Sequence, residues 1–584
     1  MTRSQKLELT WVGKDERPRL EPRILVEDAT LSYHASARVS ANDQFDNLLI
    51  HGDNLLALKA LQQQHAGTIK CVYIDPPFNT GQAFEHYDDG VEHSLYLSLM
   101  RDRLEILRSL LASDGTIFLH CDDYEQAYLK VLMDEIFGRD CFRFTFTWQS
   151  ADSPSDNKVP VASDHDFILC YTREPGIHSF KPLSAPGVLD AYSNRDEHGR
   201  LYRDRLLRKN GKNSLRTDRP SMWFEIRAPD GTSVWPIHDD GREACWALGK
   251  AEVFRRLNSN EIIWKERKKK DKVNWIPYTR EYAPENPTRP HPTIWRELQT
   301  TRQAKQHLTA LLGASNQFAT PKPEPLVARI LEICTSPGDL VLDSFLGSGT
   351  TAAVAHKMGR RWIGIELGEH AVTHCVPRLR KVVDGADPGG ITEQTNWKGG
   401  GGFRFLRLAP SLLERDHWGN WVVSREYNAA MLAEAVCKLE GFRYEPNPQV
   451  FWQQGKSTEQ DYLYVTTQTL DVRQLEWLSE SVGPDRSLKV LCRAWLGSEE
   501  SWPNLTLKKI PNAVLGRCEF GCDDYSLRIA SLPAAPESEG EETDSTAPSA
   551  ATPNTTPARR KGRARKSDAA PADTQTDLLS GSDA

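Results

Sequence analysis

Two stretches in which apolar strand patterns alternate with helix patterns constrain the fold of this chain most. The first covers residues 46–148, and the second resumes at about residue 320, with "DLVLDSF" and "RWIGIE" as its strands. Because strands that alternate with helices usually pair in parallel, both stretches are expected to contribute to one α/β sheet. Residues 149–318 lack this alternation and are rich in Arg, Lys, Pro and Trp. They are predicted to form a domain inserted into the sheet.

The remaining boundaries follow from composition. The predicted parts are an N-terminal segment (1–45), the first half of the sheet (46–148), the insert (149–318), the second half of the sheet (319–410), a small C-terminal α/β domain (411–530) and a disordered tail (531–584). The tail is rich in Pro, Ser, Ala, Thr and acids, which cannot build a core. Its basic cluster "ARRKGRARKSD" is either a solvated segment or a loose, sequence-independent DNA contact.

Charge, hydropathy and cysteine spacing exclude several classes of protein. The net charge of −7 over 584 residues does not indicate a polyanionic partner for the chain as a whole. The first residues lack an apolar signal region and no run approaches the length of a membrane span, so a cytoplasmic chain without a membrane contact is expected. Cys518 and Cys522 have no second pair at zinc spacing, and "HCDDYEQ" is better explained as a strand end with an Asp helix cap. No metal is predicted.

The stretch "IKCVYIDPPF" is an unusual end for a buried strand. Its apolar residues lead to Asp75, and two prolines, Pro76 and Pro77, then stop the strand before the aromatic Phe78. One interpretation is a simple strand cap. The other is a clamp, in which the Asp75 carboxylate and the stiffly held Pro76 carbonyl accept hydrogen bonds from an NH2 group. Phe78 would then offer a face for a nucleobase rotated out of the duplex.

A glycine loop in "VLDSFLGSGTTAAVAH" lies between a predicted strand and a predicted helix. Gly347 and Gly349 allow close approach of a ligand to the backbone, and Glu366 at the end of the next strand suits a ribose diol. A nucleotide triphosphatase loop would need a lysine that is absent, and a dinucleotide loop would need a third glycine. Two interpretations of the loop remain. One is a site for S-adenosylmethionine, which has a ribose but no pyrophosphate, and the other is a purely structural turn.

The two motifs together resemble the β-class of amino-methylating DNA methyltransferases, and more closely the Mod subunits of type III restriction-modification systems. "IDPPFNTG" precedes "FLGSGTT", and the likeness spans residues 45–385 through "GDNLLALKAL", "MRDRLEILRSLL", "YLKVLMDEIFG", "RPSMWFEIRAPDG" and "KPEPLVARILE". The resemblance implies a Rossmann-like, mostly parallel methyltransferase sheet with a permuted motif order. It also implies that the insert is a target recognition domain.

The resemblance assigns roles to individual residues. The catalytic motif is Asp75, Pro76, Pro77 and Phe78. The predicted cofactor-binding residues are Asp53, near the adenine, Lys322, near the methionine end, Asp343, Phe345, Gly347, Ser348, Gly349, Thr350 and Glu366. Asp at the first position of the catalytic motif favours adenine N6 over cytosine N4, although family members more often carry Tyr at the Phe78 position. Cytosine C5 chemistry is excluded, because it needs a Pro-Cys nucleophile that this chain lacks.

The implied partner is double-stranded DNA. Two basic clusters of the insert are expected to contact it through the predicted DNA-binding residues Arg205, Arg208, Lys209, Lys212, Lys268, Lys269 and Lys270. The resemblance further implies a homodimer and a separate restriction subunit with ATPase and nuclease activity. Three alternatives are kept: methylation of cytosine N4 in DNA, methylation of a protein amide or RNA amine, and a DNA-binding scaffold without activity. The predicted activity is site-specific methylation of adenine N6 by direct transfer from S-adenosylmethionine.

Overall fold

A computed structural model of the chain describes residues 8–41, 43–77, 89–152, 161–176, 180–269, 272–314 and 318–525. Phe78, Lys270 and the tail from residue 526 lie outside the described residues, as do the side chains of Lys268 and Lys269. Within these ranges no helix combines the length and the apolar character that crossing a bilayer would require.

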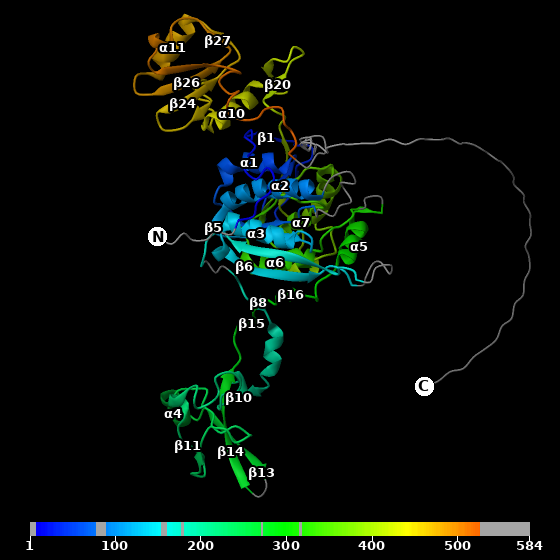
Figure 1. Cartoon of the computed structure of the whole chain (residues 1–584), viewed down its shortest axis with the longest axis vertical. Coiled ribbons are helices and arrows are strands. Elements are labelled where there is room, and N and C mark those ends of the chain that lie inside the picture. The colour runs from blue at the N-terminus through cyan, green and yellow to red at the C-terminus, as the bar shows by residue number, and fades with distance from the viewer. Residues whose placement is uncertain are drawn as a thin grey trace, which may run out of the picture. The chain divides into compact units, whose positions relative to one another are not determined.

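Eleven strands of the described chain form one mixed sheet (Figure 1). Its order is β1-β19-β3-β18-β17-β4-β5-β7-β6-β16, and β2 pairs with β19. The strands are β1 (Leu25–Glu27), β2 (Tyr33–His34), β3 (Asn47–His51), β4 (Ile69–Ile74), β5 (Leu111–Cys121), β6 (Phe142–Gln149), β7 (His165–Thr172), β16 (Ile294–Trp295), β17 (Leu340–Asp343), β18 (Arg361–Glu366) and β19 (Gly402–Leu408). The six from β19 to β5 run parallel, which confirms the predicted α/β fold with a mostly parallel sheet.

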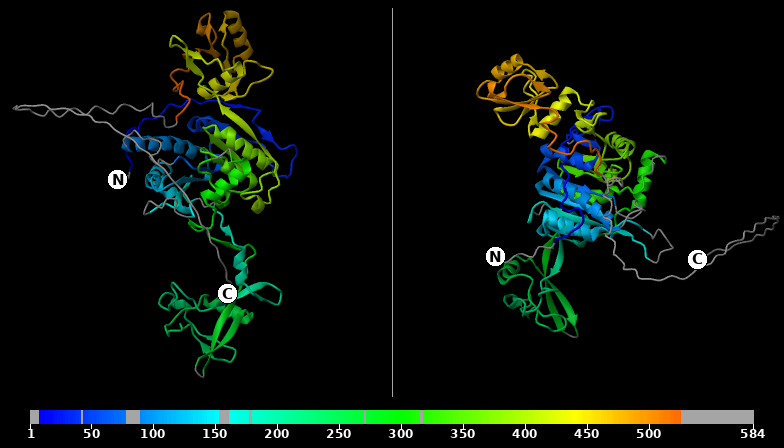
Figure 2. Two further views of the ribbon diagram at one scale, coloured as in Figure 1. Left: turned by 90° about the vertical axis from the view of Figure 1, so that its right-hand side faces the viewer. Right: turned by 45° about the horizontal axis from the view of Figure 1, so that its top comes forward.

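Helices cover both faces of this sheet (Figure 2). One face packs against α1 (Asn54–His65), α2 (Asp89–Leu110) and α3 (Gln126–Phe137), and the other against α6 (Glu324–Cys334), α7 (Thr350–Lys357) and α8 (Val376–Val383). Side chains of a strand alternate between the faces. On β4, Val72 and Ile74 therefore join the first core, whereas Cys71 and Tyr73 join the second.

The sheet also takes strands from the predicted N-terminal segment and from the predicted insert. β1 and β2 pair with β19, so the N-terminal segment contributes to the sheet. β7 pairs antiparallel with both β5 and β6, and β16 extends the sheet beyond β6. The described residues between β6 and β7 contain no helix, so the strand–helix alternation that marked the rest of the sheet does not reveal these two strands.

Two further groups of elements have cores of their own. In the insert, β9 (Asn194–Arg195), β10 (Leu201–Leu206), β13 (Ile262–Lys269) and β14 (Lys272–Tyr282) form a sheet with α4 (Lys250–Asn258) nearby in sequence. After β19, the strands β22 (Arg443–Tyr444), β23 (Gly455–Lys456), β24 (Asp461–Val465), β26 (Ser487–Cys492) and β28 (Leu505–Lys509) form a second sheet, accompanied by α10 (Ala429–Glu440) and α11 (Val472–Val482).

Candidate active site

The strand tip with the two prolines and the glycine loop lie side by side. β4 and β17 pair in parallel, with Val341 opposite Cys71 and Leu342 opposite Val72. The segments that follow the two strands therefore leave the sheet at the same edge, which is where α/β proteins bind ligands. Between them lies a cavity of about 630 Å³. Its lining includes Asp53, Asp75, Pro76, Pro77, Lys322, Asp343, Phe345, Gly347, Ser348, Thr350 and Glu366.

At this cavity, one carboxylate oxygen of Asp75 is paired with a lysine and the other has no hydrogen-bond partner among the described residues. Its Oδ2 lies 2.8 Å from the Nζ atom of Lys322, and only 9% of the lysine side chain is exposed. Its Oδ1 is buried and has no hydrogen-bond partner among the described residues. A buried oxygen without a partner is costly, so a ligand that donates a hydrogen bond would stabilise this arrangement.

The glycine loop is shaped by contacts within the chain. Asp343 accepts hydrogen bonds from the Phe345 N–H at 2.9 Å and from the Thr351 hydroxyl at 2.6 Å. Gly349 has a φ of +82°, a left-handed conformation that favours glycine, whereas a Cβ there would make only an ordinary contact of 3.4 Å with the Cα atom of Cys375. Glu366 accepts hydrogen bonds from the Gly347 N–H at 2.7 Å and from the Gly368 N–H at 2.9 Å. Its carboxylate thereby lies directly beside the loop.

The pKa of the Asp343 carboxyl lies well above its ordinary value. Burial raises the pKa of this carboxyl to about 7, against the opposing effect of its two hydrogen bonds. Because the folded chain then holds the proton to higher pH than the unfolded chain, the stability that this group contributes is full at acidic pH. It is lost as the pH rises towards 7.

Replacing Asp343 with asparagine is expected to stabilise the chain at alkaline pH. An amide can still accept from Phe345 N–H and can donate to the Thr351 hydroxyl, but it does not ionise. The stability of Asp343→Asn relative to the parent should therefore grow by about 2 kcal/mol between pH 5 and pH 8. Urea unfolding at both pH values measures this difference, and an equal difference at the two values would contradict it.

Asp53 has a structural role at the cavity. Its Oδ1 accepts from the Leu56 N–H at 3.0 Å and so begins α1, and its Oδ2 accepts from the Tyr525 N–H at 3.0 Å. Arg103, on α2, lies 3.5 Å from the same carboxylate. Arg103, Tyr73 and Tyr96 also line the cavity, although none of them was predicted from the sequence. All three are buried within a strand or a helix, and such positions carry no sequence signal for a site.

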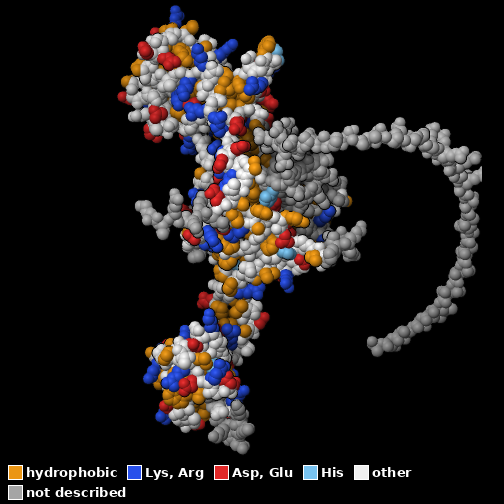
Figure 3. Space-filling model, viewed as in Figure 1, with side chains coloured by type: hydrophobic (Ala, Val, Ile, Leu, Met, Phe, Trp, Pro, Cys, Tyr) orange, Lys and Arg blue, Asp and Glu red, His pale blue; other side chains and the backbone are white. Residues whose placement is uncertain are grey.

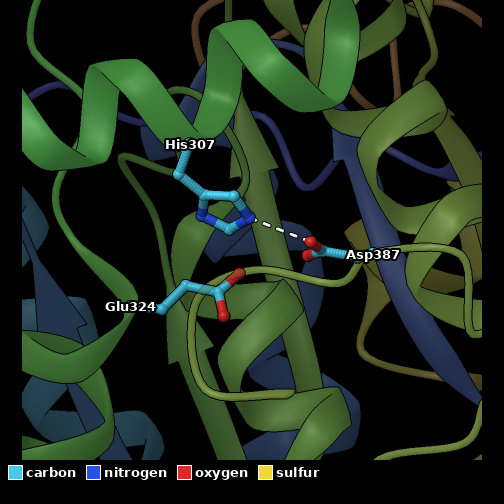
Figure 4. A group of neighbouring side chains, drawn as sticks. All are labelled: His307, Glu324 and Asp387. Carbon is cyan, nitrogen blue, oxygen red and sulfur yellow. Dashed lines mark hydrogen bonds and ion pairs between the residues drawn. The ribbon is translucent and has the colours of Figure 1, made fainter. Parts of the chain in front are cut away.

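His307, Glu324 and Asp387 form the one group of potential metal ligands found among the described residues (Figure 4). His307 lies 2.9 Å from Asp387. The position between the two carboxylates is filled by a cation of the chain itself, because Nζ of Lys357 lies 2.8 Å from Glu324 and 2.7 Å from Asp387. Arg378 pairs with Glu324 at 2.9 Å. We therefore interpret the group as a buried ion-pair network.

This network supports the glycine loop from behind. Arg378 donates to the Thr350 hydroxyl at 2.9 Å and to the Ser348 carbonyl at 3.3 Å. Burial alone would raise the pKa of Glu324, but the charges of Arg378 and Lys357 hold it below its ordinary value. The loop and the start of α6 are thus joined through charged groups that stay ionised in the core.

The predicted DNA-binding residues of the insert are partly engaged in ion pairs. Arg205 lies 2.8 Å from Glu281, and Arg208 contacts Asp239 at 3.3 Å and donates to the Ile237 carbonyl. Lys212 is exposed and Lys209 is half-buried. Basic and acidic side chains are interspersed on the visible face of this part of the chain (Figure 3). DNA binding by these residues stays a prediction.

Comparison with known proteins identifies the family. Residues 69–376 match the family model described as DNA methylase. The chain belongs to this DNA methylase family. Among curated relatives of this methylase, a probable type III restriction-modification enzyme HindVI Mod subunit of Haemophilus influenzae is 32% identical, over 62% of this chain and 54% of the relative. The type II methyltransferase M.KpnI of Klebsiella pneumoniae is 31% identical, over 54% of this chain and 78% of the relative. The resemblance to a methylase of the Mod type is confirmed.

The chain covers only part of the length of its Mod relatives, and its similarity to solved structures is low. The methylase described here spans 54% and 60% of the length of two Mod subunits that it matches, HindVI and EcoPI of Escherichia phage P1. A DNA modification methylase of Thermus thermophilus, solved with S-adenosyl-L-methionine, superposes with a TM-score of 0.30 at 15% identity, over 62% of this chain and 98% of that one. Similarity at that level is too low to support an assignment.

Proposed function

We propose that this methylase transfers a methyl group from S-adenosylmethionine to the exocyclic N6 amine of adenine in duplex DNA. The observation that carries the proposal is the buried Oδ1 atom of Asp75, which has no partner among the described residues and belongs to a residue lining a cavity shared with the glycine loop. An oxygen in that position accepts a hydrogen bond but cannot donate one while Asp75 is ionised. It therefore suits an NH2 group as substrate.

The cavity fits the proposed cofactor. Its volume of about 630 Å³ is in the range of small-molecule sites. Glu366 places a carboxylate beside Gly347, where it suits two vicinal hydroxyls. Phe345 and the backbone of the glycine loop would border the nucleoside. When bound, S-adenosylmethionine supplies an electrophilic methyl group on a sulfonium.

The chain's own residues would activate and place the amine. The lone pair of an exocyclic amine is delocalised into the base, so the nitrogen is a poor nucleophile. Hydrogen bonds to Asp75 Oδ1 and to the Pro76 carbonyl would favour a pyramidal nitrogen and make the lone pair available. Pro76 and Pro77 restrict the backbone, which keeps that carbonyl in place. Phe78, proposed to stack on the rotated base, lies outside the described residues.

The identity of the product tests this proposal. Purified chain is incubated with tritiated S-adenosylmethionine and with genomic DNA from a host that lacks methyltransferases, and the DNA is digested to nucleosides. We expect the label in N6-methyladenine. Label in N4-methylcytosine would instead favour the second candidate, a cytosine-N4 methyltransferase. Label in protein or RNA alone would contradict a DNA substrate. Long-read sequencing of DNA from cells that express the chain would add the recognition sequence.

Three further assignments belong to this proposal. The likeness to Mod subunits supports a role as the modification component of a restriction-modification system, together with a restriction subunit that cleaves DNA. We also propose that the chain acts as a homodimer and that the insert, centred on residues 183–289, contacts DNA. Three of the basic residues predicted for that contact, Arg205, Lys268 and Lys269, belong to its strands β10 and β13, and Arg208, Lys209 and Lys212 follow β10 in the chain.

A further inference from the structure

Lys322 contacts the carboxylate expected to hold the substrate, whereas the sequence predicted that it binds the cofactor. Its Nζ atom lies 2.8 Å from Asp75 Oδ2, and the exposed fractions of the two side chains are 9% and 22%. Because the ammonium occupies Oδ2, the second oxygen of Asp75 is the one available to an amine. That oxygen is buried and has no partner of its own in the described part of the chain.

Several other ionisable groups that interact with Asp75 carry no positive charge. They are Tyr73 on β4, Tyr96 on α2, Cys121 on β5 and Asp343 on β17. Among these groups and Lys322, the ammonium of Lys322 is the cation that pairs with the Asp75 carboxylate.

Lys322 is itself held in place from several directions. It lies between Pro321 and Pro323, which restrict its backbone. Its carbonyl accepts a hydrogen bond from the Thr350 hydroxyl at 3.1 Å, so its backbone is attached to the glycine loop. The residue after Pro323 is Glu324, which is anchored in the buried ion-pair network. The lysine is therefore fixed relative to the predicted cofactor loop as well as to Asp75.

A buried chain of hydrogen bonds places a second acid near Lys322. The Tyr73 hydroxyl lies 3.0 Å from His120 Nδ1, and His120 Nε2 lies 2.9 Å from Asp166 Oδ2. Burial would raise the pKa of Asp166, but the hydrogen bond from His120 and the charges of His120 and Lys322 hold it below its ordinary value. The positive charge of Lys322 thus acts on two acids, one of which lies at the tip of β4.

We propose that Lys322 is a positioning residue for methyl transfer, whose ammonium holds Oδ2 of Asp75, so that Oδ1 is presented to the substrate amine. The inference rests on the proposed function and assigns Lys322 to the substrate side of the site. If Lys322 has this role, its replacement should slow methyl transfer and should change the affinity for S-adenosylmethionine little.

Lys322→Met removes the charge at nearly constant side-chain volume. In single-turnover experiments at saturating S-adenosylmethionine and pH 7.5, with the same genomic DNA, we expect the rate to fall about 10²-fold. The dissociation constant of S-adenosylmethionine, measured by calorimetry, should change by less than about threefold, a difference worth under 1 kcal/mol.

Lys322→Arg is the matched variant, since it keeps the charge but changes its geometry. It should recover part of the rate. Thermal unfolding of both variants, together with their affinity for S-adenosylmethionine, shows whether the site is folded. A role confined to structure would lower stability and cofactor affinity along with the rate.

Two results would overturn the proposal. One is a tenfold weaker affinity for S-adenosylmethionine with an unchanged single-turnover rate, which would assign Lys322 to the cofactor. The other is an unchanged single-turnover rate and an unchanged cofactor affinity in Lys322→Met. Failure of the proposed function looks different, because the parent chain would then transfer no methyl group to DNA at all.

Discussion

Replacing Asp75 with alanine is expected to lower the rate of methyl transfer by at least about 10³-fold while leaving cofactor affinity within about threefold. The variant removes the acceptor that is proposed to bind the amine in the transition state. It does not alter the glycine loop, whose shape depends on Asp343, Cys375 and Glu366. Transfer of tritium from S-adenosylmethionine to genomic DNA measures the rate, and calorimetry measures the affinity.

Two further variants make this experiment specific. Asp114→Ala removes another carboxylate that is paired with a lysine, Lys70, beside the opposite end of β4, and it should leave the rate unchanged. Asp75→Asn keeps one acceptor oxygen and should retain more activity than Asp75→Ala. A rate for Asp75→Ala equal to that of the parent would refute the clamp, whatever the product of the reaction is.

The position of the site could be predicted because it depends on strand ends. An apolar run that ends in Asp75 and two prolines can only be a strand tip, and the glycines after Asp343 can only be a tight turn before a helix. The parallel pairing of β4 with β17 then brings the two together, as the α/β alternation suggested. The motif order placed both on one sheet although more than 260 residues separate Asp75 from Asp343 in the sequence.

The extent of the sheet could not be predicted in the same way. "HDFILCYT" forms β7, which pairs antiparallel with both β5 and β6, but no helix precedes it among the described residues that follow β6. Periodicity alone does not distinguish such a strand from an isolated hairpin of an inserted domain. β1, β2 and β16 have two or three residues each, which is too short for a periodic signal.

The buried ion-pair network could not be predicted from the sequence either. Lys357 and Arg378 follow helix patterns at positions that would normally be assigned to solvent, and Glu324 looks like an ordinary acid in the first turn of a helix. All three are buried because each supplies a partner for another. Whether a charge lies in the core depends on partners from distant segments, and a single sequence does not reveal such partners.

Replacing Lys357 with methionine is expected to lower the free energy of unfolding by about 3–5 kcal/mol. Its ammonium, fully buried, is shared by the carboxylates of Glu324 and Asp387. Methionine fills similar volume but leaves two buried acids with one fewer cation, and breaking a buried pair from one side costs far more than its net contribution. Urea unfolding of the parent and the variant at pH 7.5 measures the difference.

Lys305→Met, at an exposed position of α5 (Thr301–Leu312), is the matched control and should change the free energy of unfolding by no more than about 0.5 kcal/mol. Adding Glu324→Gln to Lys357→Met should restore part of the loss, because it removes one of the uncompensated charges. A loss below about 1 kcal/mol in Lys357→Met would mean that the network does not depend on this cation.

Since Arg378 joins Glu324 to Thr350, the same variant also tests whether the glycine loop draws its rigidity from the network. If it does, affinity for S-adenosylmethionine falls with stability in Lys357→Met and recovers with it in the double variant.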